Sequence, residues 1–145
     1  MANYYTQFCF GVALHTPEEK AWWEATETSY HECSPDCPEG CDKQSDDDCN
    51  GSGIDITFDE TGVIIVSEEG GNADWAAGTV QEFLSEFKRD DVVTFAWACT
   101  CSRMMADAFG GGAYAISRLR THGIGTFTLE VQYAAELLAE LKAAK

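Results

Sequence analysis

The sequence predicts an α+β domain in which a mostly antiparallel sheet carries helices on one face. Segments that alternate large with small or polar side chains, as strands do, are separated by segments with helical spacing. Their order along the chain is β-α-β-β-α-β-β-α, which matches a ferredoxin-like β-α-β-β-α-β core followed by a C-terminal hairpin and a helix. The 145 residues fit one domain, residues 1–145, with a Cys-rich acidic loop inserted at residues 31–53.

The first strand and helix have clear local signals. Residues 4–14 place large side chains on one face and small or polar ones on the other, which predicts a strand. Thr16, Pro17 and Glu19 then supply an N-cap, a proline at the first helical position and a capping-box acid. A helix should therefore run to about Tyr30.

The middle of the chain predicts two strands and a second helix. Residues 54–58 alternate as an edge strand does, whereas residues 63–67 are apolar on both faces, as in a central strand. Asn72 can cap the second helix. Lys88 and Arg89 would suit the negative end of its dipole.

The strongest strand pattern lies at residues 92–101, and a short final strand is predicted at residues 113–117. The C-terminal helix is marked by apolar residues at helical spacing, namely Val131, Ala134, Leu138 and Leu141.

Two strands carry small residues on one face. The large-residue faces of the first and fourth strands should pack under the helices. The opposite faces would leave a shallow platform around Cys9, Gly11, Ala96 and Ala98. We expect another element or a second subunit, as in a homodimer, to be able to cover it.

The charge of the chain is unusual and unevenly distributed. The formal net charge is −16, and residues 1–75 carry 17 acids and two bases, whereas residues 76–145 carry 8 acids and 7 bases. Such a field repels nucleic acid and anionic membranes and attracts basic protein surfaces or cations. Acidic residues also promote solubility, which is the simpler interpretation.

The compartment is expected to be the cytoplasm. No apolar run approaches the roughly 18 residues of a membrane span, and the first residues lack the basic segment of a signal peptide. In a reducing cytosol, seven cysteines more often stay free or bind metal than form disulfides.

The most specific local signal is a set of metal-ligating residues in the inserted loop: His31, Cys33, Cys37, Cys41 and Cys49. Four thiolates and an imidazole could supply a structural tetrahedral zinc site, although the spacing is looser than that of zinc knuckles. Disulfides and unligated thiols are the alternatives. Four protein ligands would leave no open position for catalysis.

An enzyme site is a second hypothesis. It would lie where the fourth strand ends, at Cys101, Ser102 and Arg103, with the glycine loop Gly110, Gly111 and Gly112. A nucleophilic cysteine needs a neighbouring base or cation, and only Arg103 is adjacent. Core packing is the preferred interpretation of Cys99, although Cys9 could join it and Cys101 in a redox cluster.

Part of the chain, residues 54–117, resembles a family of small uncharacterised bacterial proteins that phages and plasmids often carry. The residues that carry the resemblance are Ser67-Glu68-Glu69, Gly71-Asn72, Val80-Gln81-Glu82-Phe83-Leu84, Trp97-Ala98-x-Thr100-Cys101-Ser102 and Phe109-Gly110-Gly111-Gly112-Ala113. The resemblance implies no established activity and therefore no catalytic residues. The Cys-rich loop and residues 103–107 depart from the family pattern.

The leading functional prediction is a non-enzymatic inhibitor from a mobile element, of the phage anti-defence type. Its carboxylates would engage a basic, nucleic-acid-binding protein in place of backbone phosphates, with aromatic residues as anchors. The predicted partner-binding residues are Glu32, Asp36, Glu39, Asp42, Asp46, Asp47, Asp48, Glu68, Glu69, Trp22 and Tyr30. A structural protein stiffened by its metal loop is the remaining alternative.

Overall fold

A computed structural model describes residues 4–31, 53–104 and 109–144. Its elements are β1 (Tyr4–Ala13), α1 (Pro17–His31), β2 (Asp55–Phe58), β3 (Gly62–Ser67), α2 (Ala73–Glu86), β4 (Val93–Cys101), β5 (Gly110–Ile116), β6 (Thr121–Gly125) and α3 (Thr126–Ala143). The predicted α+β fold is confirmed.

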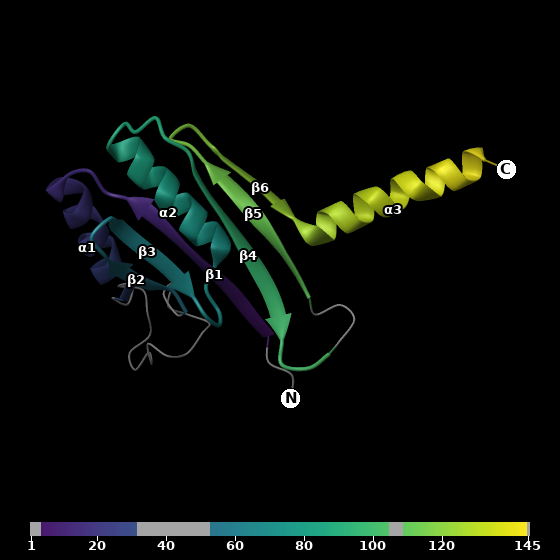
Figure 1. The fold of residues 1–145 in the computed structure, drawn as a ribbon, viewed down its shortest axis with the longest axis horizontal. Helices are drawn as coiled ribbons and strands as arrows, with labels where there is room; N and C mark the ends of the chain where they lie inside the picture. Colours follow the sequence, from purple (N-terminus) through teal and green to yellow (C-terminus); the bar gives the residue numbers. More distant parts are fainter. Residues whose placement is uncertain (1–3, 32–52, 105–108, 145) are drawn as a thin grey trace, which may run out of the picture.

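The strands form one six-stranded antiparallel sheet in the order β2-β3-β1-β4-β5-β6 (Figure 1). The first four positions have the order of a ferredoxin-like core, in which β3 lies between β1 and β2. The β5–β6 hairpin extends the sheet beyond β4. This arrangement puts β2 at one edge and β6 at the other.

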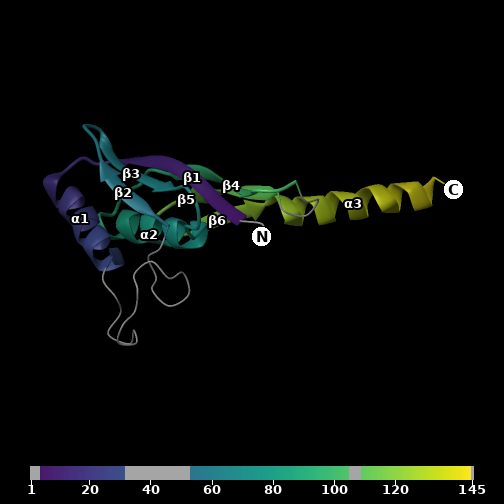
Figure 2. The same cartoon turned by 90° about the horizontal axis from the view of Figure 1, so that it is seen from below.

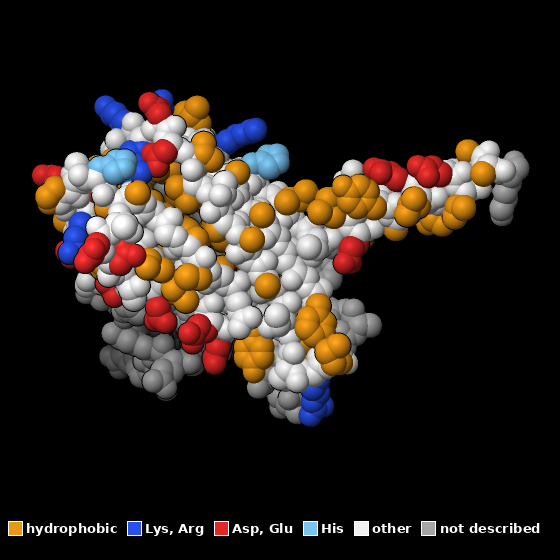
Figure 3. Space-filling model, in the orientation of Figure 1, with side chains coloured by type: hydrophobic (Ala, Val, Ile, Leu, Met, Phe, Trp, Pro, Cys, Tyr) orange, Lys and Arg blue, Asp and Glu red, His pale blue; other side chains and the backbone are white. Residues whose placement is uncertain are grey.

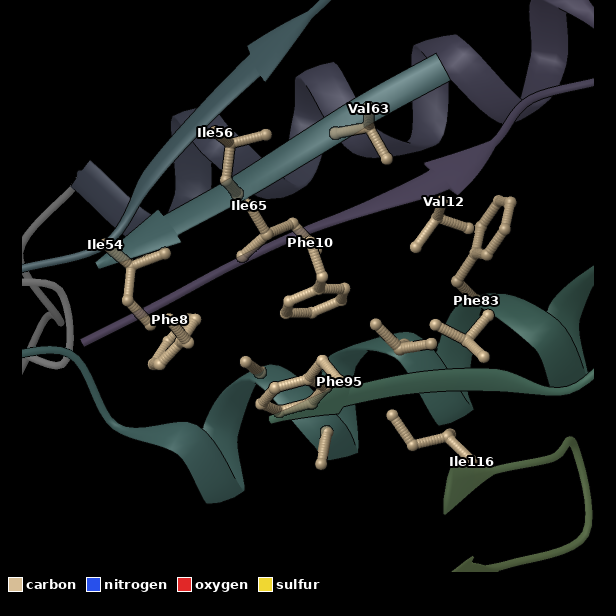
Figure 4. Packing of buried hydrophobic residues seen from close by; sticks show 14 of the residues in the cluster. Phe8, Phe10, Val12, Ile54, Ile56, Val63, Ile65, Phe83, Phe95 and Ile116 are labelled. Atoms are coloured by element: carbon tan, nitrogen blue, oxygen red, sulfur yellow. The ribbon is translucent and has the colours of Figure 1, made fainter. Parts of the chain in front are cut away.

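Helices α1 and α2 cover one face of the sheet (Figure 2). The core between the layers holds Phe10 of β1 and Phe95 of β4, whose rings stack at 4.1 Å, together with Phe83 of α2 (Figure 4). Trp23 of α1 belongs to the same core. The large-residue faces of β1 and β4 therefore pack under the helices, as the alternation predicts.

The opposite face of the sheet is open. Cys9, Gly11, Ala96 and Ala98 are all exposed, because these small residues alternate with the core residues of β1 and β4. In the space-filling view this face shows separate apolar groups among backbone and uncharged polar side chains (Figure 3). We call it the open sheet face and include in it the outward residues of β3 and β5.

The predicted capping of α1 by Thr16 and Glu19 is confirmed. The hydroxyl oxygen of Thr16 accepts a hydrogen bond from the N–H of Glu19 at 3.2 Å. The carboxylate of Glu19 reaches back to the N–H of His15 at 2.6 Å. Two backbone donors at the helix terminus are therefore satisfied by side chains.

The prediction for Arg89 was wrong. Helix α2 ends at Glu86, and Lys88 adopts φ 51, which turns the chain back. Arg89 is consequently buried, where it bonds the carbonyl of Ala13 at 2.5 Å and pairs with Glu19 at 3.5 Å. It joins the end of β1 to the first turn of α1.

Strand β6 was not predicted, and β5 is longer than predicted. Gly110, Gly111 and Gly112 belong to β5, paired with Cys99, Ala98 and Trp97, and so do not form a loop. A Cβ atom at Gly112 would lie 2.8 Å from the ring of Trp97. Gly112 therefore leaves room for the ring of Trp97, which extends from β4 over β5.

Helix α3 projects away from the rest of the chain (Figures 1 and 2). It begins at the residue after β6 ends, and the N–H of Gly111 donates to the hydroxyl of Thr126 at 2.9 Å. This bond fixes the first turn of the helix to the sheet. Beyond that turn the helix extends outward.

Candidate functional site

The candidate site is the end of the sheet at which the chain re-enters from residues 32–52. Gly53 packs closely on the connection between β3 and α2, since a Cβ atom on it would lie 2.8 Å from the backbone of Gly70 and of Gly71. Glu68 and Glu69 stand immediately before these glycines. The acidic loop of the sequence is therefore joined to the described chain beside two further acids.

The backbone that carries these two acids is fixed. Ser67 is buried, and its hydroxyl donates to the carbonyl of Thr6 and accepts from the N–H of Gly71, both at 2.8 Å. The N–H of Thr6 donates to the carbonyl of Glu69 at 2.6 Å. The side chain of Gln7 donates to the carbonyl of Glu68 at 3.1 Å.

Asp55 completes the acidic group on the described chain. It lies at the start of β2, opposite Val66, and its side chain is exposed together with those of Glu68 and Glu69. Within the described residues, ion pairs involve Glu19, Glu24, Asp90 and Asp91. The charges of Asp55, Glu68 and Glu69 are thus not neutralised there. We call these three residues the acidic edge.

Basic residues gather at the opposite end of the strands. Arg118 and Arg120 lie in the β5–β6 turn, and the hydroxyl of Ser85 in α2 donates to the carbonyl of Arg118 at 3.2 Å. Figure 3 shows most Lys and Arg side chains near the top of the view and several acids at the lower left. Acids lie at this end too, among them Asp90, which pairs with Arg118 at 2.9 Å.

The acids of the first half do not all share one surface. Asp59 lies in the β2–β3 turn, at the other end of these strands, where its carboxylate accepts hydrogen bonds from the Thr61 hydroxyl and N–H and from the Gly62 N–H. These bonds, led by that of the Thr61 hydroxyl, lower the pKa of Asp59 below its ordinary value. Glu19 is buried.

The predicted aromatic anchors, Trp22 and Tyr30, differ in how much of their side chains the structure describes. Trp23 is fully buried, and Trp22 is half-buried with its ring edge-on to Trp23 at 5.1 Å and 5.5 Å from Phe83. Trp22 therefore offers a partner only the remainder of its ring. The backbone of Tyr30 is in α1, and its side chain lies outside the described set.

Most of the predicted loop residues lie outside the described chain. These are the partner-binding acids Glu32, Asp36, Glu39, Asp42, Asp46, Asp47 and Asp48 and the metal ligands Cys33, Cys37, Cys41 and Cys49, together with the side chain of His31. In the described residues no group of three or more His, Cys, Asp or Glu side chains could hold a metal ion. The zinc site stays a prediction.

The proposed redox cluster was wrong. Cys9, Cys99 and Cys101 are free thiols, but Cys9 faces the open sheet face, whereas Cys99 and Cys101 alternate with its outward residues and face the other side. The sheet itself therefore separates Cys9 from the other two sulfurs.

The glycine loop of the enzyme hypothesis was also wrong, because these glycines are strand residues. The N–H of Gly111 is bonded to Thr126. Ser102 and Arg103 are exposed at the end of β4.

Comparisons with protein-family models, curated proteins and solved structures yield no match for this chain. None of the described helices has both the length and the apolar character needed to cross a membrane.

The sequence analysis predicted Glu68 and Glu69 as partner-binding residues. It did not predict Asp55, because a polar residue at that position is already explained by the alternation of an edge strand.

Proposed function

We propose that this protein is a non-enzymatic binding protein whose acidic edge engages a basic, nucleic-acid-binding protein surface, as phage inhibitors of host defence complexes do. The observation that supports the proposal is the fixed turn at Ser67, which presents Glu68 and Glu69 to solvent without ion-pair partners in the described chain. A fixed backbone lowers the entropic cost of presenting carboxylates in place of backbone phosphates, because less of the chain must be ordered on binding.

The acidic loop would extend this surface. Residues 32–52 contain seven acids and one lysine, and the chain leaves them at Gly53, beside Glu68 and Glu69. Like charges that gather near a fixed anchor raise the rate at which a basic partner is captured. A partner that normally binds nucleic acid would then be blocked, because the acidic protein would occupy the surface that the nucleic acid needs.

The experiment measures capture of partners from a bacterial host lysate by the wild type and by the Glu68→Gln/Glu69→Gln variant. The matched control is Glu82→Gln/Glu86→Gln, which removes the same charge from exposed positions of α2. We expect the acidic-edge variant to lose about threefold to tenfold in affinity for a captured basic partner, since each exposed charge contributes under about 1 kcal/mol.

Salt and nucleic acid provide the second readout. Binding should weaken markedly from about 50 to 500 mM salt, because exposed charges are screened within about 10 Å at 0.1 M. Added double-stranded DNA should compete with the protein for the partner. The proposal would be rejected if no basic protein were captured, or if both charge variants bound equally.

A further inference from the structure

Helix α3 carries an apolar surface that nothing in the described chain covers. Its exposed large residues are Val131, Tyr133, Leu137, Leu138 and Leu141, each between 54% and 72% exposed. At about 100° per residue, these side chains lie within an arc of about 160°. So broad a stripe is typical of a helix that packs on a globular surface, because a two-helix coiled coil needs only a narrow seam.

The open sheet face is the second uncovered apolar surface. It is hollowed along β1 and β3, where Cys9, Gly11, Ala13 and Ile64 line a shallow groove of about 420 Å³ that ends at Asp59 and Thr61. Small residues of β4 and β5, among them Ala96 and Ala113, continue it. Large side chains on a helix and small ones on a sheet are the combination that lets two layers interdigitate.

We propose that the chain forms a homodimer in which α3 of each protomer packs across the open sheet face of the other. The helix cannot readily reach its own sheet face, because β6 ends at Gly125 and α3 begins at Thr126. Reversing the direction of the chain usually takes a connection of about 2–6 residues. The open sheet face of a second copy can contact the projecting helix without a loop that reverses the chain.

The exchange is reciprocal and closed by two-fold symmetry, so that each contact occurs twice. A helix of 18 residues is about 27 Å long and about 10 Å wide, with a footprint on the order of 270 Å². Two helices on two faces bury on the order of 1,100 Å² in all, which passes the ~1,000 Å² expected of a stable interface. A single contact would bury only half as much.

The charge of the chain fixes the expected salt dependence. Two chains of net charge −16 repel each other, and added salt screens this repulsion. Dimerisation should therefore be maintained or strengthened by salt. This is the opposite of the behaviour expected of the basic-partner complex, so the two proposals fail independently.

The first test compares four variants by sedimentation, each adding one lysine. Leu137→Lys alters the helix stripe, and Ala139→Lys alters its polar side. Ala96→Lys alters the open sheet face, and Ala21→Lys alters the exposed side of α1. At about 20 µM, a concentration at which stable interfaces persist, we expect the wild type, Ala139→Lys and Ala21→Lys to be dimers. In Leu137→Lys and Ala96→Lys, the dissociation constant of the dimer should rise by a factor of ten or more.

The second test mixes the two disrupted variants. Ala96→Lys keeps an intact helix and Leu137→Lys keeps an intact sheet face, so the mixture should associate through one good contact. This heterodimer should be weaker than the wild-type dimer but stronger than the association of either variant alone. A monomeric wild type would overturn the proposal. So would an Ala96→Lys variant that dimerises as the wild type does, because the helices would then be pairing with each other. The Glu68→Gln/Glu69→Gln variant should dimerise normally.

Discussion

At the scale of single residues, Arg89 shows how much one side chain can connect. Its guanidinium contacts the Ala13 carbonyl at the end of β1, Glu19 in α1, and Asp91 in the connection before β4. It also lies over the ring of Phe83 at 5.3 Å. The sequence analysis placed it at the end of the second helix, where a basic residue suits the negative end of the dipole. The burial could not be predicted, since it depends on the left-handed turn at Lys88.

Replacing Arg89 with methionine should destabilise the fold by about 3–5 kcal/mol, because Glu19 would stay buried without its cationic partner. Urea denaturation measures the change. Arg118→Met is the matched control, since its pair with Asp90 is 42% and 84% exposed and should contribute about 0–1 kcal/mol. Equal losses in the two variants would contradict the role assigned to Arg89.

Asp91 makes part of the stability depend on pH. The hydrogen bond from Arg89 holds the pKa of Asp91 below its ordinary value of 3.8. A carboxyl with a lowered folded pKa contributes stability above its unfolded pKa and loses it as the pH falls through the folded one. The half-exposed position of Asp91 limits this contribution to about 1 kcal/mol.

Asp91→Asn should therefore be less stable than the wild type by about 1 kcal/mol at pH 7. The two should converge as the pH falls below 3.8. Thermal unfolding across this range tests the expectation, with Asp55→Asn as the control for loss of an exposed acid. A gap that stays constant down to low pH would contradict it.

At the scale of elements, the sequence predicted best where alternation involved large residues. Strands β1 and β4 follow from their aromatic and aliphatic periods, and α1 and α2 from caps and stripes. Strand β6 was missed because Thr121–Gly125 holds two glycines and no large alternation. Gly123 makes room for the neighbouring strand, since the ring of Tyr114 would lie 2.5 Å from a Cβ atom there.

The fit between Trp97 and Gly112 can be tested directly. Gly112→Ala should destabilise the fold by about 1–3 kcal/mol, because the new methyl group meets the Trp97 ring and the carbonyl of Ile124. Gly125→Ala, opposite Gly112 in β6, is the control and should cost little, because the nearest atom to its new methyl group would lie 3.8 Å away. Chemical denaturation of both variants decides whether steric fit or strand propensity governs β5.

At the scale of the whole molecule, the sequence could indicate that two surfaces needed covering, but not what covers them. The platform around Cys9, Gly11, Ala96 and Ala98 was predicted and is confirmed. The stripe of α3 predicted a helix, yet a stripe alone gives no information on whether its partner belongs to the same chain. The charge asymmetry likewise indicated an acidic surface, whereas the fold divides those acids between the two ends of the strands.

Dimerisation should make the helix content depend on concentration. An isolated helix of 18 residues is marginal in water, so α3 should lose helicity when its apolar stripe is uncovered. Circular dichroism should show the helical signal of the wild type and of Ala139→Lys falling on dilution. Leu137→Lys should give the lower signal at concentrations where the wild type is a dimer. A constant signal across a dimer-to-monomer transition would contradict this prediction.

The direct junction at Gly125 makes α3 a lever arm. Because no flexible linker absorbs rotation there, a twist of about 10° in the β5–β6 hairpin moves the far end of the 27 Å helix by about 5 Å. The hydrogen bond between Gly111 and Thr126 ties that motion to β5 itself. Small rotations of the glycine-rich hairpin therefore produce large changes in the position at which the far end of α3 meets the partner protomer.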